Sequence, residues 1–431
     1  MGRDRLGAPV VRTGRARTTT PPGLPEGPRT VTVVLLEALT FGLGRIADAA
    51  RDAGHDLVLL TGDRSTYTHE LARCGDGVRV VDVDTTDVTA CEKALRDLPD
   101  VAALISSTDT WAIPGAELAH RLGVPGPSPD AVRVLRDKAA VRARLHERGL
   151  SRSGPLDPTT AADFPLVLKD SAGTSSRAVW LARTSAERDA ALREAAGTAL
   201  KGRLVAEPYF EGPLYSAETI TWRGETRLLG VLSRVLSPEP AHREEASAFP
   251  VAFPADDLAA LDGWIGRVLD AAGHERGFAH TEFVLTTTGP EVVEVNARIG
   301  GALVGEALCR ALGTNVYDSM VQVALGARPD LLDGGPGRGA ATAFVALYPR
   351  AAGVLAGWDG LDRLADLPGD VEWYPTASPG DLIEHLADQR SCTGIVLAGG
   401  PTAELALHRA QAAAGRVVPV VRAPRPSAVP A

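Results

Sequence analysis

The order of hydrophobic and polar positions changes along the chain. From residue 29, the apolar runs TVTVVLLEAL, HDLVLL, VRVVDV and VAALIS are separated by segments with helical spacing. Continuous apolar strands that alternate with helices are typical of a parallel sheet covered on both faces. A Pro/Gly-rich connection, GVPGPSPD, then interrupts the pattern. The first region therefore predicts a doubly wound α/β domain over residues 29–127.

The regions on either side of this domain follow other patterns. LVLKD, LVAEP, TEFVLT and EVVEVN are short strands. Residues 331–431 carry short β-like runs and a helix near 401–414, which predict a small C-terminal β-rich domain. Residues 1–28 are rich in Arg, Pro, Gly and Thr, which favours a disordered tail.

The most informative segment, GFAHTEFVLTTTGPEVVEVNARIGG, spans residues 277–301. Two runs rich in β-branched residues flank a turn signal, so we expect a β-hairpin. If residues 287–289 form a three-residue loop with its glycine in the left-handed conformation, Glu282 lies opposite Glu294. The hairpin thus predicts two carboxylates on one face.

Asn296 and Arg298 extend this polar face, because alternate residues of a strand point to the same side. Opposed carboxylates repel each other, and a hard divalent cation relieves that repulsion. We therefore expect Glu282, Glu294 and Asn296 to bind Mg²⁺, with Mn²⁺ as an alternative. On these residues alone, a solvated surface with ordinary ion pairs is an equal alternative.

Two upstream segments suit a nucleotide. FPLVLKDSAGTSS is an apolar strand that ends in Lys169 and leads into small residues, whose backbone N–H groups can approach an anion. The Walker and dinucleotide patterns are both missing, so a plain hairpin turn is the alternative. LVAEPYFEG passes from a strand to Pro208 and two aromatic residues, which offer flat apolar surface or simply end an edge strand.

In their order and spacing these segments resemble the ATP-grasp ligases. The matching elements are Lys138 in RDKAAVRARL, Lys169 in FPLVLKD, Glu207 in LVAEPYFEG, and the hairpin that ends in Glu294-Val-Asn296. The resemblance implies a multidomain ATP-grasp fold, α/β and α+β, with an N-terminal doubly wound pre-ATP-grasp domain. The family resemblance that these segments carry implies two α+β lobes, over residues 128–200 and 201–330. It also implies ATP and Mg²⁺ as cofactors.

The resemblance assigns roles residue by residue. The residues that would bind ATP are Lys138, Lys169, Ser175, Ser176, Glu207, Pro208, Phe210 and Glu218. Glu207 would accept from the adenine amino group, and Glu218 would lie near the ribose. Arg298, Glu282 and Glu294 would be catalytic. The residues that would contact substrate are His280, Arg298, Gly300 and Gly301.

A late segment, SCTGIVLAGGPTAELALHRAQAA, resembles the C-terminal domain of the L-amino acid ligases. That resemblance implies activation of a carboxylate, such as an amino acid, as an acyl phosphate. An amine would then displace phosphate to form an amide or dipeptide, with ADP as the other product. The expected partners are thus a small-molecule carboxylate and amine, and a homodimer is the default assembly.

The composition of the chain argues against several classes of protein. The net charge of -9 over 431 residues argues against binding to nucleic acid or to an anionic membrane surface. Four dispersed cysteines lack metal-site spacing and favour reduced thiols. No apolar run reaches the roughly 18 residues of a spanning helix, and the expected location is the cytoplasm.

Some residues depart from the family pattern or remain ambiguous. Asp170 follows Lys169 where the family commonly has proline, and Leu214 stands where many relatives carry an acid. Glu37 and Asp109 follow predicted parallel strands, so they are either substrate contacts or solvated acids.

Two other functions fit the same motifs. The first is another ATP-grasp chemistry, either bicarbonate-dependent carboxylation or ligation of a nucleotide precursor. The second is a nucleotide-binding regulatory protein without turnover.

Overall fold

The computed structural model describes residues 30–239, 243–334 and 339–423, and the predicted tail over residues 1–28 lies outside them. Contacts group residues 31–431 into one unit and residues 1–30 into another. No helix in the described ranges has the length and apolar character needed to cross a membrane.

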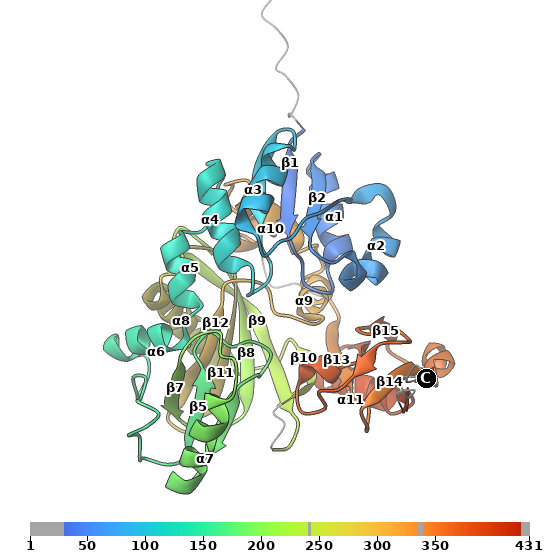
Figure 1. Cartoon of the computed structure of the whole chain (residues 1–431). Coiled ribbons are helices and arrows are strands. Elements are labelled where there is room, and N and C mark those ends of the chain that lie inside the picture. Colours follow the sequence, from blue (N-terminus) through green and yellow to red (C-terminus); the bar gives the residue numbers. More distant parts are fainter. Residues whose placement is uncertain (1–29, 240–242, 335–338, 424–431) are drawn as a thin grey trace, which may run out of the picture. The chain divides into compact units, whose positions relative to one another are not determined.

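The N-terminal region forms a parallel sheet with the strand order β3-β2-β1-β4. Its strands are β1 (Thr32–Leu36), β2 (Asp56–Thr61), β3 (Arg79–Asp82) and β4 (Val101–Ile105), and its helices are α1 (Leu43–Asp52), α2 (Thr68–Cys74), α3 (Val88–Arg96) and α4 (Ala112–Leu122). Val33 and Leu35 pack with α1, whereas Val34 and Leu36 pack with α3 and α4. Helices therefore cover both faces, which confirms the doubly wound prediction (Figure 1).

A three-stranded antiparallel sheet, β6-β5-β7, comes next. Its strands are β5 (Leu166–Asp170), β6 (Val179–Ala182) and β7 (Leu204–Pro208), and the nearby helices are α5 (Pro129–Leu135), α6 (Lys138–Glu147) and α7 (Ser185–Ala196). Asp137 caps α6 by accepting hydrogen bonds from two backbone N–H groups. Helix α6 therefore begins at Lys138, and Arg142 follows on the same side one turn later.

The central sheet is antiparallel and has the order β12-β11-β8-β9-β10-β13-β17-β15. Its strands are β8 (Leu214–Trp222), β9 (Glu225–Leu236), β10 (Glu244–Phe249), β11 (Arg276–Thr286), β12 (Gly289–Asn296), β13 (Ala341–Leu347), β15 (Glu372–Pro375) and β17 (Gly394–Gly400). Helix α8 (Ala255–Ala272) covers one face, where Trp264 and Ile265 pack with Ala217 and Phe283. The polar residues of the site project from the opposite face.

The β11–β12 hairpin has the predicted pairing of Glu282 with Glu294, although the predicted turn is wrong. Thr286 pairs with Gly289, so the loop contains two residues and not three. A β-bulge between Glu282 and Phe283 inserts Val293 on β12 and restores the pairing. Like the expected left-handed glycine, Gly289 has a positive φ of 124°.

Three of the C-terminal strands, β13, β15 and β17, extend the central sheet. β13 pairs with β10 and with β17, and β17 pairs with β15. The predicted helix is α11 (Ala403–Ala414), which packs its alanines on β13 and β17. Three further strands, β14 (Gly353–Asp359), β16 (Leu382–Ile383) and β18 (Val418–Arg422), form a small antiparallel sheet. The remaining elements are α9 (Val304–Leu312), α10 (Tyr317–Ala324), η1 (Arg64–Tyr67), η2 (Gly75–Gly77), η3 (Asp330–Leu332), η4 (Leu361–Asp366) and η5 (Gln389–Ser391).

We expect Phe283→Ala to destabilise the sheet that carries the hairpin. The Phe283 side chain is fully buried between Trp264 and Tyr215, at ring distances of 5.7 Å. Loss of its packing should lower the free energy of unfolding by about 3–5 kcal/mol, whereas Phe283→Leu should cost much less. Urea unfolding followed by circular dichroism measures both variants, and equal stability of Phe283→Ala and the wild type would contradict this packing.

Candidate functional site

Glu282 and Glu294 face each other on neighbouring strands, and other elements supply cations to both. Glu282 lies 3.0 Å from Arg234 Nη1. Glu294 lies 2.9 Å from Lys138 Nζ and 3.7 Å from Arg136 Nη1. Burial alone would raise the pKa of Glu282, but the charge of Arg234 holds that pKa below its usual range. The Glu282 carboxylate is therefore held in the ionised form that a metal ligand needs.

Asn296 lies two residues beyond Glu294 and is 3% exposed. With its amide oriented to satisfy both polar atoms, the nitrogen lies 3.1 Å from Glu294 Oε1 and 3.2 Å from Asp109 Oδ1. The reverse orientation presents the amide oxygen at the same place. The structure thus brings the three predicted metal ligands into one polar patch.

This donor set fits a cation that shares its ligands with a phosphate. Two carboxylates and an amide are hard oxygen donors, as Mg²⁺ prefers. Across the described residues, no group of three or more His, Cys, Asp and Glu side chains converges as a metal site. The protein therefore offers part of a coordination shell, and phosphate oxygens and water suit the remaining positions.

Arg298 pairs with Asp109, which follows β4 of the parallel sheet. Asp109 also lies 3.2 Å from Arg136 Nη1. Burial would raise the pKa of Asp109, but the charges of Arg298 and Arg136 hold it below its usual range. Of the two acids that follow parallel strands, Asp109 thus lies in the candidate site. Glu37 does not, since Gly62 N–H, Tyr67 and Thr85 all donate to its carboxylate.

His280 belongs to a buried network on the same face. Its Nδ1 is hydrogen bonded to Glu218, and its Nε2 lies 2.9 Å from Arg234 Nη1. Burial would lower the pKa of His280, but Glu218 raises it to about 9. The Gly300 N–H donates to Glu218 at 3.3 Å, and a Cβ at Gly300 would lie 2.7 Å from His280 Nδ1. Glu218 and the Gly300 amide therefore serve this network, while a Cβ at Gly301 would meet open space.

The two predicted nucleotide lysines lie beside the hairpin. Lys138 Nζ lies 2.6 Å from the carbonyl oxygen of Gly173, so Lys138 connects the small-residue loop to Glu294. Lys169 Nζ donates to the carbonyl oxygen of Val293, the bulged residue, at 3.1 Å. The bulge thus provides an acceptor for Lys169 next to the acidic pair.

The loop after Lys169 has an unusual backbone. Ser175 and Ser176 have positive φ values of 58° and 56°, which are uncommon for residues other than glycine. The side chain of Asp170 is bonded to backbone groups of the loop and of a neighbouring turn. Its carboxylate accepts from the backbone N–H groups of Ala172, Lys201 and Gly202, at 3.0, 2.7 and 2.8 Å. Asp170, which departs from the family pattern, therefore connects the loop to a neighbouring turn by hydrogen bonds.

The carboxylate of Glu207 contacts two cationic side chains. Its Oε2 lies 2.9 Å from Lys169 Nζ and 2.8 Å from Arg142 Nη2, and the carboxylate is 4% exposed. Burial would raise the pKa of Glu207, but Lys169 and Arg142 hold it below its usual range. These contacts favour a role in holding Lys169 over the expected acceptance from adenine.

Phe210 lies beyond Pro208, the last residue of β7, and two guanidinium groups stack on its ring. The distances to the ring centroid are 5.2 Å for Arg142 and 5.3 Å for Arg152. Pro208 itself pairs with Leu166 on β5. The structure therefore places the predicted adenine segment beside Arg142 and the two lysines.

Sequence reasoning missed Arg136 and Arg142 as members of the site. Arg142 could have been found because it follows Lys138 by four residues on a predicted helix. Arg136, two residues before Lys138, carries no pattern of its own. Its role depends on Asp109, Glu294 and Asn296, which come from distant segments.

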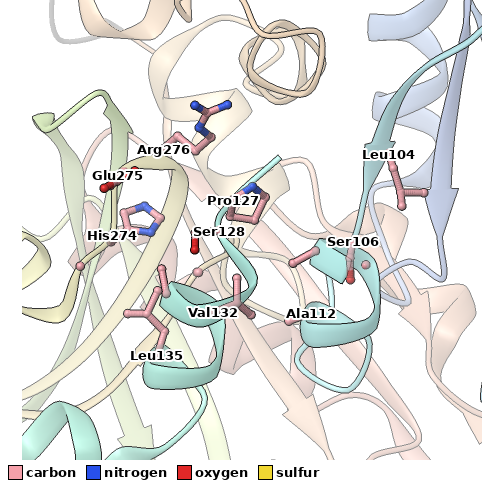
Figure 2. A pocket seen from close by; sticks show the side chains of 15 residues that line it. Leu104, Ser106, Ala112, Pro127, Ser128, Val132, Leu135, His274, Glu275 and Arg276 are labelled. Atoms are coloured by element: carbon pink, nitrogen blue, oxygen red, sulfur yellow. The ribbon is translucent and has the colours of Figure 1, made fainter. Parts of the chain in front are cut away.

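A separate hollow of about 80 Å³ lies between the parallel sheet and the segment before β11 (Figure 2). Leu104, Ala112 and Leu135 line it, together with the segment 273–276. It meets the hairpin at Ala297. The hollow therefore does not coincide with the acidic pair.

Comparison with known proteins identifies the family. A model of the ATP-grasp N-terminal domain matches residues 47–126, and a model of the L-amino acid ligase C-terminal domain 2 matches residues 345–422. The fold is similar to that of L-amino acid ligase from Bacillus licheniformis, with a TM-score of 0.77 and 19% identity, over 91% of this chain and 99% of that one. The chain is an ATP-grasp protein with an L-amino acid ligase C-terminal domain.

This ATP-grasp protein is also similar to a carboxylase domain and to a synthase. The biotin carboxylase domain of Hydrogenobacter thermophilus 2-oxoglutarate carboxylase, solved with MgADP, ADP and bicarbonate, has a TM-score of 0.71 and 16% identity, over 90% of each chain. Carnosine synthase 1 of Gallus gallus is 26% identical over 261 residues, which are 53% of this chain and 28% of that protein. The ATP-grasp chain thus corresponds to a minor part of that synthase.

We expect Arg142→Met to destabilise this ATP-grasp protein. The substitution removes the buried cation that Glu207 and Glu291 share, so the free energy of unfolding should fall by about 3–5 kcal/mol. Arg144→Met is the matched control, because Arg144 lies on the same helix and, among the described residues, its guanidinium bonds only to the Ala272 carbonyl oxygen. Urea unfolding should separate the two variants, and equal losses would refute the buried network.

Stability should also depend on the charge of His274, which lines the hollow. Burial lowers the pKa of His274 from 6.5 to about 4. The unfolded chain therefore binds this proton at a higher pH than the folded chain does. The contribution of the neutral His274 is present above pH 6.5 and is lost as the pH falls toward 4.

Relative to His274→Gln, the wild type should lose up to about 1.4 kcal/mol of unfolding free energy per pH unit over this interval. Urea unfolding of both proteins from pH 7 downward measures the difference. A difference that stays constant with pH would show that His274 titrates normally.

Proposed function

We propose that this chain is an ATP-dependent ligase that activates a carboxylate and joins it to an amine, releasing ADP and phosphate. The convergence of Glu282, Glu294 and Asn296 with Lys138 and Arg298 carries the proposal. One patch then combines oxygen donors for a cation with positive groups for phosphates. The L-amino acid ligase domain and the similarity to carnosine synthase favour an amine as the acceptor.

The chain's own residues would bind and orient the nucleotide. Mg²⁺ would offset the charge of the phosphates of ATP, which supplies the phosphoryl group. Lys138 and Lys169 would neutralise phosphate oxygens, and the backbone at Ser175 and Ser176 would approach them. Glu207 would keep Lys169 in place from the side away from the phosphates. Catalysis would rest on positioning and electrostatics, without a nucleophilic side chain.

Arg298 is the residue we expect at the reacting groups. It is half-buried, and its pairing with Asp109 fixes one end of its guanidinium. Its Nε has no hydrogen-bond partner among the described residues. We propose that Arg298 offsets negative charge on the transferring phosphoryl group and on the oxygen of the tetrahedral intermediate that forms during amine attack.

We further propose that the carboxylate and the amine are amino acids or related small molecules. His280, whose ring is held by Glu218 and Arg234, would lie beside the carboxylate group as one of the expected substrate residues. Gly301 would leave space for a substrate beside it. A cytoplasmic homodimer remains our prediction for the assembly and its location.

The test is release of ADP and phosphate from MgATP over a panel of paired amino acids, with mass spectrometry of each active mixture. Glu294→Gln should lower the rate on the order of 100-fold, because it removes a charged oxygen donor. Glu225→Gln is the matched control, since this exposed acid of the same sheet pairs with Arg328 away from the hairpin.

Each other outcome points to a different function. A strict need for bicarbonate would replace amide formation with carboxylation. ATP binding without turnover under any substrate would indicate a regulatory nucleotide-binding protein. Full activity of Glu294→Gln would contradict the proposed metal ligand.

A further inference from the structure

The distribution of lysine in this chain is uneven. The sequence has four lysines against 41 arginines, so arginine is the ordinary cation at its surface. Lys93 lies on α3 of the parallel sheet. The other three surround one loop: Lys138 contacts the Gly173 carbonyl oxygen, Lys169 precedes the loop, and Lys201 reaches it from the turn before β7. Motif reasoning identified the first two loop lysines and gave no role to Lys201.

The turn at Lys201 is built against the loop. Asp170 accepts from the backbone N–H groups of Lys201 and Gly202 and from that of Ala172 within the loop. A Cβ at Gly202 would lie 2.5 Å from Ser171 Oγ and 2.9 Å from the Ala172 nitrogen, so only glycine fits this approach. The backbone of Lys201 is thus held in a fixed position relative to the loop.

The Lys201 side chain points along the loop. Its Nζ lies 3.0 Å from Thr174 Oγ1, although the residue as a whole is exposed. An exposed lysine can place its charge in water, yet this one donates to a loop hydroxyl. Its ammonium group therefore already lies beside the segment that leads to Ser175 and Ser176.

Positive charge gathers at this loop, and the carboxylates of Asp170 and Asp109 offset part of it without pairing with the Lys201 ammonium group. In the described part of the chain, neither Lys201 nor Arg177 forms an ion pair with a carboxylate, and Asp170 is occupied by backbone N–H groups. Partial burial lowers the pKa of Lys201, and the charges of Arg177 and Arg136 lower it further. Like charges held together at a loop of exposed N–H groups suit an anion.

We propose that Lys201 is a third phosphate-binding lysine, which contacts the polyphosphate of the nucleotide from the turn that Asp170 fastens to the loop. The proposal rests on the nucleotide site of the proposed function and adds a residue to it. A lysine suits this place because its compact charge on a flexible stem can follow a phosphate group, whereas a planar guanidinium demands a fixed geometry.

The small number of lysines allows a direct test. The intact protein is treated with an amine-reactive acetylating reagent, and mass spectrometry follows the labelling rates of Lys201 and Lys93. Both residues are exposed, so Lys93 is an internal control. MgATP should slow labelling of Lys201 at least about 5-fold and leave Lys93 unchanged, while adenosine should protect neither. Tripolyphosphate should also protect Lys201.

Substitution gives a second measurement. Lys201→Met should raise the Kd of ATP about 10-fold, as expected for loss of one charge-assisted hydrogen bond, and leave the Kd of adenosine unchanged. Lys201→Arg should recover part of the affinity, and Lys93→Met should have no effect. Calorimetry measures all four proteins, and unchanged melting temperatures exclude a structural loss.

The outcomes separate this inference from the function on which it rests. If ATP binds but neither protects Lys201 nor binds more weakly to Lys201→Met, the lysine proposal is overturned and the nucleotide site stands. If ATP does not bind but tripolyphosphate protects Lys201, the anion site stands and the ATP-dependent function falls. If ATP does not bind and tripolyphosphate does not protect Lys201, both proposals are overturned.

Discussion

Two carboxylates opposite each other on neighbouring strands are the constraint around which this site is organised. At the separation of facing side chains, about 5 Å, their repulsion in a partly buried setting is about 3 kcal/mol. The fold offsets it with cations from outside the hairpin: Arg234 from β9, Lys138 from the start of α6, and Arg136 from the end of α5. The acidic pair therefore connects helices α5 and α6 to the central sheet. A bound cation would enter a site where Arg234, Lys138 and Arg136 already offset much of the negative charge of the two carboxylates.

The β-bulge at Val293 sets the geometry of this pair. Side-chain alternation alone would place Val292 and Glu294 on one face, yet Val292 packs in the α8 core while Glu294 projects to the polar side. The inserted residue makes both positions possible, and its carbonyl oxygen accepts from Lys169. The sequence was sufficient to predict the pairing of Glu282 with Glu294. It did not predict the bulge, because a two-residue loop with a bulge and a three-residue loop without one produce the same facing pair.

Other parts of the fold show where prediction from sequence is limited in physical terms. Apolar continuity was enough for the parallel sheet, and short β-like runs were enough for β13, β15, β17 and β18 of the C-terminal region. Neither pattern shows which strand has an unpaired edge, so the pairing of β13 with β10 could not be predicted from the sequence. Glu207 and Asp170 are similar cases, because the direction of each carboxylate depends on partners that folding brings close: Lys169 and Arg142 for the first, and the backbone at 201–202 for the second.

These two acids also explain how a buried, highly charged region can hold its lysines in defined positions. Glu207 holds Lys169 by its charge, at the cost of burying a carboxylate that Arg142 must also neutralise. Asp170 acts on backbone groups instead, and fixes the turn that carries Lys201 without pairing with the lysine side chain. The ammonium group of Lys201 is thus left available for an anion, whereas that of Lys169 is shared with Glu207. Lys201 is therefore held in place through its backbone, and its ammonium charge is not neutralised by the acid that holds it. A lysine that contacts a polyphosphate directly needs both properties.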